Sequence, residues 1–79
     1  MPRYYFDMRD GDGVVPDDEG MELPTLKAVQ QEAAQSLAHM ARDAIGEHPN
    51  GPIGPMAIEV RDDAGPVLQV QLQFSIHRE

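Results

Sequence analysis

The sequence predicts an α+β fold of order ββαββ, in which one helix packs on a four-stranded, mainly antiparallel sheet. Three observations support this prediction. Over residues 4–15, an alternating aromatic segment runs through a doubled Asp-Gly turn into a second apolar segment, which is a strong hairpin signal. A long segment with helical spacing of apolar residues follows. Two further alternating segments, separated by a turn, end the chain.

The first hairpin is expected to have one long and one short strand. Tyr4, Phe6 and Met8 share one face of the first strand because side chains alternate along a strand. The second strand covers residues 13–16, and Pro16 cannot donate a ladder hydrogen bond. We therefore expect this strand at an edge of the sheet, followed by a turn over residues 17–20.

The central segment is predicted to be a helix that begins after Thr25 and runs to Ile45. The Thr25 hydroxyl can accept from the first free backbone amides of the helix, and neither Gly nor Pro interrupts the segment. Gly46 is the expected terminator. One apolar stripe results from the residues at helical spacing, which are Leu26, Val29, Ala33, Leu37, Met40, Ala41 and Ala44.

The last third of the chain predicts a second hairpin after a flexible connector at about residues 46–55. Residues 56–61 alternate, residues 62–66 form a turn, and residues 68–76 form a long, regular strand. We expect this last strand to pair with the first at the centre of the sheet. The expected strand order is therefore second, first, fourth, third.

Length and composition predict one small domain over residues 1–79, without disulfides because the chain has no cysteine. A core of this size is near the lower limit for independent stability, so a homodimer is expected. The net charge of -8 disfavours nucleic-acid and anionic membrane partners, and it permits a basic protein or a cation. Neither a signal peptide nor a membrane span is recognised, which predicts a cytoplasmic protein.

Acidic residues crowd the segment after the first strand, namely Asp10, Asp12, Asp17, Asp18 and Glu19. Hard cations take oxygen ligands of this kind, but the calcium-loop pattern fails. Counted from Asp10, the third ligand position is Val14, the glycine position is Val15 and the closing glutamate position is Met21. Turn formation explains the same acidic residues. We therefore predict no metal and no cofactor, and we interpret these residues as a candidate interaction surface.

No catalytic residues are predicted. Ser36, His39 and Asp43 lie one helical turn apart, as a nucleophile and its base could, but a straight helix provides no oxyanion hole. They are interpreted as polar helix surface. Residues 51–55 are rich in Gly and Pro but lack the lysine and the helix start of a phosphate-binding loop. The chain is therefore expected not to be an enzyme.

The outer face of the last strand carries an uncharged polar row of Gln69, Gln71, Gln73 and Ser75. Tyr5 and Ala57 are expected to extend this row on neighbouring strands. The row is either a solvated sheet face or a contact surface, because amides can pair without the cost of burying charge. The three glutamines complete the candidate interaction surface.

Three segments carry a family resemblance: residues 3–11, residues 17–24 and residues 57–62. They resemble a family of small bacterial proteins of unknown function that is frequent in alphaproteobacteria. The resemblance implies a stand-alone cytoplasmic domain and transfers no catalytic residue. From Phe6 to Leu37 the pattern is also similar to HicB-type antitoxins, which place an Asp-Gly hairpin before an alanine-rich helix. The chain lacks the DNA-binding tail that such antitoxins commonly carry.

The leading functional interpretation is a non-enzymatic module that binds another protein through its acidic end or its sheet face. The antitoxin resemblance implies a basic toxin as the partner. The alternative is a domain that binds a small ligand or a cation. A protein partner predicts co-purification, whereas a small ligand predicts a thermal shift without a change in mass.

Overall fold

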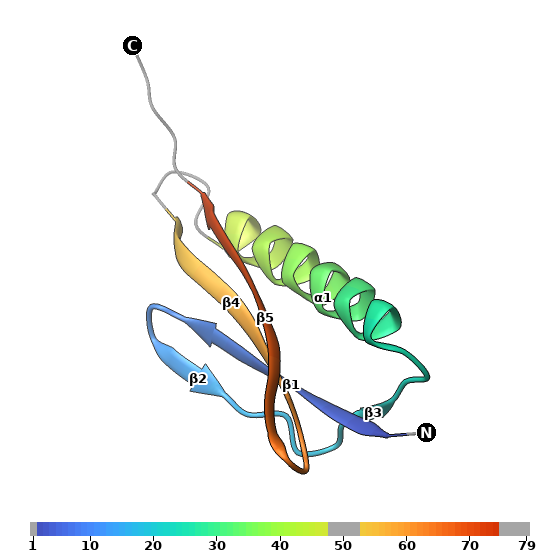
Figure 1. Cartoon of the computed structure of the whole chain (residues 1–79). Coiled ribbons are helices and arrows are strands. Elements are labelled where there is room, and N and C mark those ends of the chain that lie inside the picture. The colour runs from blue at the N-terminus through green and yellow to red at the C-terminus, as the bar shows by residue number, and fades with distance from the viewer. Residues whose placement is uncertain (1, 48–52, 75–79) are drawn as a thin grey trace.

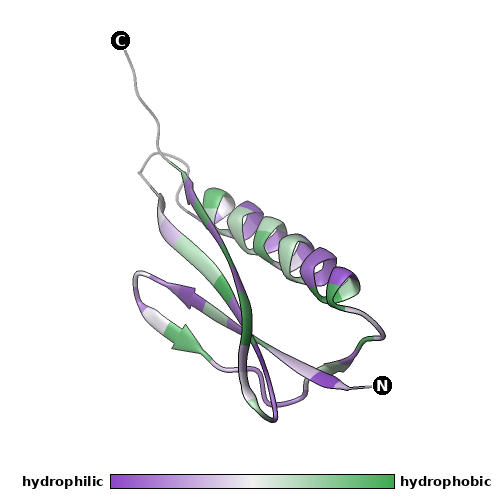
Figure 2. Cartoon of the chain, viewed as in Figure 1, coloured by the Kyte–Doolittle hydropathy of each residue, from purple (hydrophilic) through white to green (hydrophobic). Residues whose placement is uncertain are grey.

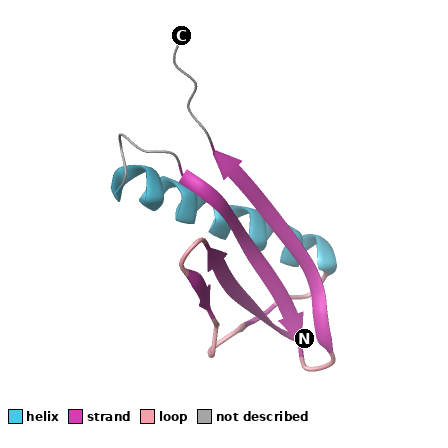
Figure 3. Ribbon diagram, turned by 90° about the vertical axis from the view of Figure 1, so that its left-hand side faces the viewer, coloured by secondary structure: helices cyan, strands magenta, loops and turns pink. Residues whose placement is uncertain are grey.

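A computed structural model describes residues 2–47 and 53–74. It contains one helix against one face of an antiparallel sheet (Figures 1 and 3), and it confirms the α+β class and the ββαββ order. The elements are β1 (Arg3–Asp10), β2 (Gly13–Val15), β3 (Met21–Glu22), α1 (Leu26–Glu47), β4 (Ile53–Asp62) and β5 (Gly65–Phe74). The two-residue β3, which pairs with the start of β1, is an addition to the four predicted strands.

The strand order is β2-β1-β4-β5, so the predicted central pair is wrong. β1 pairs with β4 through Phe6 and Val60, and β5 lies at an edge. The prediction ranked strands by length, but burial decides which strand is central. Ile58 and Val60 of β4 are at most 1% exposed, whereas no residue of β5 is fully buried. The expected edge position of β2 is confirmed.

The helix begins as predicted and ends later. The backbone N–H of Ala28 donates to Thr25 Oγ1 at 3.0 Å, which is the expected N-terminal cap. Gly46 does not terminate the helix, because its φ is not positive and the helix continues to Glu47. The predicted connector at residues 46–55 is therefore shortened by α1 at its start and by β4 at its end. Residues 48–52 of that segment lie outside the described part of the chain.

The core lies between α1 and the central strands. Apolar and polar residues alternate along these elements (Figure 2). The helix and the sheet together form one buried cluster, which consists of Tyr4, Val29, Ala33, Leu37, Ala41, Met56, Ile58 and Val60. Leu26, which was expected in the apolar stripe, is 60% exposed because it stands at the first turn of the helix. Within the described residues, no helix combines the length and the apolar character needed to cross a membrane.

Candidate functional site

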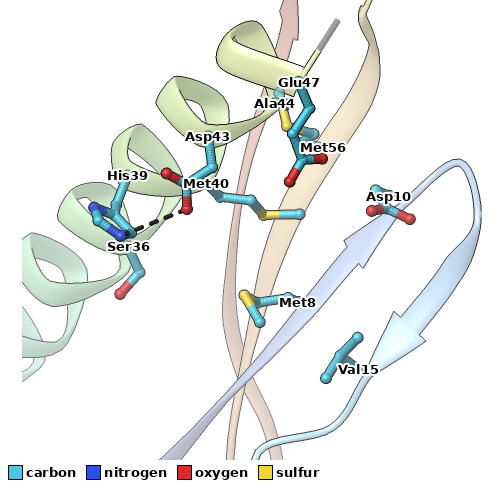
Figure 4. Close-up of a pocket in the computed structure, with 10 residues that line it drawn as sticks. All are labelled: Met8, Asp10, Val15, Ser36, His39, Met40, Asp43, Ala44, Glu47 and Met56. Carbon is cyan, nitrogen blue, oxygen red and sulfur yellow. Dashed lines mark ion pairs between the residues drawn. The ribbon is translucent and has the colours of Figure 1, made fainter.

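An open groove of about 460 Å³ lies between the C-terminal half of α1 and the β1–β2 hairpin (Figure 4). Its floor and walls are apolar and come from four elements: Met8 of β1, Val15 of β2, Met40 and Ala44 of α1, and Met56 of β4. We call these five residues and the acidic rim described below the methionine groove. Three of the five methionines of the chain line it.

The groove exists because α1 is placed off-centre on the sheet. The helix packs on β4 and β5, while its contacts with β1 and β2 are few. Met8 pairs with both Val15 and Ile58, so all three side chains point to the helix face of the sheet. Ile58 lies under the helix and is fully buried, whereas Met8 and Val15 lie beyond it and are 40% and 60% exposed. Apolar surface is therefore left uncovered.

The rim of the groove is acidic. Asp10 stands at the end of β1, and Asp43 and Glu47 stand on the last two turns of α1. No Lys or Arg is among the lining residues in the described part of the chain. His39 contacts Asp43, with Nε2 3.6 Å from Oδ2, and it is the only basic group on the rim among the described lining residues. Three carboxylates around an apolar floor make the electrostatic potential at the rim negative.

The three polar helix residues with the spacing of a nucleophile and its base also lie on this rim. Ser36, His39 and Asp43 line the groove from one side of α1 (Figure 4). The side chains of His39 and Asp43 are 74% and 64% exposed, and the described hydrogen bonds include none between Ser36 and His39. Their geometry is that of polar residues at the edge of a groove.

The structure separates the predicted acidic surface into distinct places. Asp10 lies on the rim of the groove, and its Oδ1 accepts from the backbone N–H of Asp12 at 2.8 Å, which stabilises the hairpin turn. Asp18 and Glu19 are exposed in the loop between β2 and β3. These residues therefore do not form one continuous cluster.

Asp17 has a structural position that the sequence did not reveal. Phe6 lies between the β1 residues that pair with β3 and those that pair with β2, and its N–H donates to Asp17 Oδ2 at 3.1 Å. Asp17 Oδ1 accepts from Glu19 and Gly20, at 3.1 and 3.2 Å. The backbone N–H of Asp17 donates to Asp7 Oδ1 at 2.8 Å. Between β3 and β2, where no strand pairs with this edge of β1, the Asp17 carboxylate therefore accepts the hydrogen bond that a neighbouring strand would accept.

These contacts also set the ionisation of Asp17. Partial burial alone would raise the pKa of Asp17. The hydrogen bonds from Phe6, Gly20 and Glu19 and the charge of Arg61 outweigh burial, so the pKa lies below its ordinary value. Asp17 is therefore held as a carboxylate that closes a loop.

The glutamine row lies on the edge strand rather than at the centre of the sheet. Gln69, Gln71 and Gln73 are exposed, and Ser75 lies outside the described residues. The neighbouring strand presents Glu59 opposite Gln69 and the nearly buried Ala57 opposite Gln71.

The wider sheet face is charged. Tyr5 lies on β1 opposite Arg61, beyond β4, and the same face of β1 carries Asp7 and Arg9. Ala57 of β4 therefore extends the uncharged row beyond β5, as predicted, whereas Tyr5 lies among charged residues and does not extend it.

Within the described ranges, no group of three or more His, Asp or Glu side chains is placed to hold a metal ion. The methionine groove was not predicted, because its apolar residues have the spacing of core residues. Only the position at which α1 crosses the sheet leaves Met8 and Val15 exposed. The exposed Val15, next to the expected edge at Pro16, was the one available sequence signal.

Comparison with known proteins gives a family and no activity. No curated protein and no solved structure matches the chain. The sequence model of a domain of unknown function, DUF6894, matches residues 3–73. The match includes the helix and all described strands, except for the last residue of β5, Phe74. The chain therefore belongs to the DUF6894 family.

Proposed function

We propose that this domain is a non-enzymatic protein-interaction module whose methionine groove binds a basic, amphipathic helical segment of a partner protein. A cytoplasmic location is part of the proposal. The observation that carries it is the combination of an uncovered apolar floor with a rim of three carboxylates. In the antitoxin-like version of the proposal, the bound segment belongs to a basic toxin.

The side chains of the floor suit a protein partner. Methionine is unbranched and flexible, so Met8 and Met40 can adapt to the apolar side of a bound helix. Exposed apolar surface surrounded by polar groups is typical of interaction sites. An amphipathic helix bound in a groove buries one face and leaves the other at the rim.

The rim determines which helix is accepted. A bound helix with Lys or Arg flanking its apolar face places these cations close to Asp10, Asp43 and Glu47. A helix with acidic flanks brings like charges together and is excluded. The remaining negative charge of the chain accelerates association with a basic partner and makes it sensitive to salt.

Nuclear magnetic resonance of the isotope-labelled chain tests the proposal directly. The probes are a helical Leu/Lys model peptide and a Leu/Glu peptide with the same apolar pattern. We expect the Leu/Lys peptide to shift the amide signals of Met8, Val15 and the C-terminal half of α1, and added salt to weaken binding. The Leu/Glu peptide should leave these signals unchanged. Equal binding of both peptides would contradict the proposal.

A matched pair of variants shows whether binding occurs in the groove. Val15 points into the groove, while its neighbour Val14 pairs with Arg9 on the opposite face, and both are exposed. Val15→Glu should weaken Leu/Lys peptide binding about tenfold or more, as expected for a central interface residue. Val14→Glu adds the same charge on the other face and should leave the affinity nearly unchanged.

A small apolar ligand is the second candidate. Its support is the groove volume of about 460 Å³, which lies within the range of small-molecule sites. Such a ligand would raise the melting temperature without changing the mass, and Val15→Glu would abolish that rise. A protein partner changes the mass as well, which separates the two candidates.

A further inference from the structure

The edge formed by β5 is unusually unprotected. Within the described residues, β5 pairs with β4 on one side only. On the other side, the N–H and C=O groups of about every second residue face outward without a strand partner. Proteins usually protect such an edge with charged side chains, bulges or proline. Gly65–Phe74 contains no charged residue, and its one proline, Pro66, and the register shift next to it at Val67 both lie at the start of the strand.

The side chains of β5 determine which strand can be added there. On the helix face, β5 presents partly buried apolar residues and Leu72, which is 38% exposed. On the outer face it presents Gln69, Gln71 and Gln73. A fitting strand therefore carries apolar residues on one face and uncharged polar residues on the other. β5 itself has this pattern.

The charge of the chain also favours self-pairing through β5. Two copies, each with a net charge of -8, repel each other at most contacts. β5 offers ten consecutive residues without charge, so two copies can approach there with their carboxylates apart. On the other edge, β2 has only three residues and stands between Asp12 and Asp17, and β3 has two residues, one of them Glu22. β5 is therefore the edge at which a second copy meets the least repulsion.

We propose that β5 pairs antiparallel with β5 of a second copy, which joins two sheets into one continuous sheet in a symmetric dimer. Antiparallel pairing of identical strands requires a two-fold axis perpendicular to the sheet, so both helices lie on the same face. Residues directly opposite each other point to the same face. Gln side chains consequently meet Gln side chains, and apolar residues meet apolar residues.

Gln71 is the residue closest to the two-fold axis in the register that centres the glutamine row. Gln71 then faces its own copy, Gln69 faces Gln73 of the partner copy, and Val70 faces Leu72. This register covers the exposed part of Leu72. The dimer uses no residue of the methionine groove, so it is independent of the function proposed above.

The mass in solution and a charge variant test the interface. Sedimentation equilibrium should give twice the 8.7 kDa mass of the chain. Gln71→Lys places two cations face to face at the axis and should raise the dimer dissociation constant about tenfold or more. Gln31→Lys makes the same change on the exposed side of α1 and should leave the dimer intact. A monomeric wild-type chain, or a Gln71→Lys variant that dimerises equally well, would overturn the proposal.

Cysteine cross-linking tests the register independently of stability. The chain has no cysteine, so a single introduced thiol can react only with its copy. Gln71→Cys should give a covalent dimer under mild oxidation, because opposed residues near the axis lie within disulfide reach. Val14→Cys, on the edge strand β2, should form no covalent dimer under the same treatment. Cross-linking of Val14→Cys without that of Gln71→Cys would place the interface elsewhere and contradict the proposal.

Discussion

Arg61 and Asp7 form an ion pair across β4 and β1, with Nε 2.9 Å from Oδ2. Asp7 lies directly opposite Glu59, and Arg61 lies opposite Tyr5, so the pair is diagonal. Arg61 also lies over the Tyr5 ring, with Cζ 4.6 Å from its centroid. Its Nη2 donates to the Asp17 carbonyl oxygen at 2.9 Å. This one guanidinium therefore links the central strand pair to the Asp17 loop.

A double-mutant cycle should find favourable coupling between Arg61 and Asp7. Asp7 is mostly buried, with 15% of its side chain exposed, so loss of Arg61 leaves a poorly solvated carboxylate. Arg61→Gln and Asp7→Asn should each lower the free energy of unfolding, and the double variant should lose less than their sum. Urea unfolding of the four proteins gives the coupling.

The Arg9–Glu59 pair provides the control for this cycle. It joins the same two strands, but its side chains are 53% and 38% exposed. Exposed ion pairs contribute little to stability, so Arg9→Gln with Glu59→Gln should show weaker coupling. Equal coupling energies in the two cycles would show that burial of Asp7 does not strengthen its interaction with Arg61.

Asp17 should make the fold sensitive to acid. The pKa of Asp17 in the folded chain is below its unfolded value of about 3.9. The Asp17 carboxylate therefore contributes fully to the free energy of unfolding above that pH. This contribution is lost as the pH falls through the lower, folded pKa. Asp17→Asn should lower the free energy of unfolding by about 2 kcal/mol at neutral pH, as expected for hydrogen bonds to a charged group. It should also flatten the decline in stability below about pH 4.

Asp18→Asn is the matched control for the acid prediction. Asp18 is adjacent, exposed, and makes none of the described hydrogen bonds of Asp17. Thermal unfolding followed from neutral pH down through the acid range compares the two variants. An acid profile of Asp17→Asn identical to that of the wild type would contradict the prediction.

Gly20 should tolerate no side chain. Its φ of +75° lies in the left-handed region, and a Cβ would stand 2.9 Å from Arg3 Cγ, 2.9 Å from Tyr5 Cε1 and 3.0 Å from the Tyr4 carbonyl oxygen. Gly20→Ala should therefore cost more than the ~1–2 kcal/mol of the backbone conformation alone. Gly11→Ala, with nothing within 4 Å and no positive φ, should change stability by less than about 0.5 kcal/mol.

Local patterns predicted most of the fold, because they determine each element separately. The Asp-Gly turn, the Thr25 cap and the alternation within strands depend on neighbours in sequence. Strand order depends on contacts between distant segments. A signal for it was present: Asp7 and Arg9 on the first strand complement Glu59 and Arg61 on the strand that pairs with it. The uncharged last strand offers no such match.

The candidate site was less predictable than the fold. The sequence identified Asp10 as acidic surface, but it did not separate Asp17, whose carboxylate is used within the fold. The groove depends on where α1 crosses the sheet, and periodicity cannot specify that position. Met8 and Ile58 belong to the same face, yet only Ile58 is covered by the helix.

Filling the groove should stabilise the domain and abolish peptide binding. Ala44 is half-buried in the wall of the groove, next to Met40 and Met56. Ala44→Leu adds apolar volume where space exists, so the melting temperature should rise or stay constant. The same side chain occupies the space for the partner, and Leu/Lys peptide affinity should fall about tenfold or more. Ala34→Leu, on the exposed side of α1, is the control and should leave affinity unchanged. A stabilised Ala44→Leu variant that still binds the peptide normally would place the binding site outside the groove.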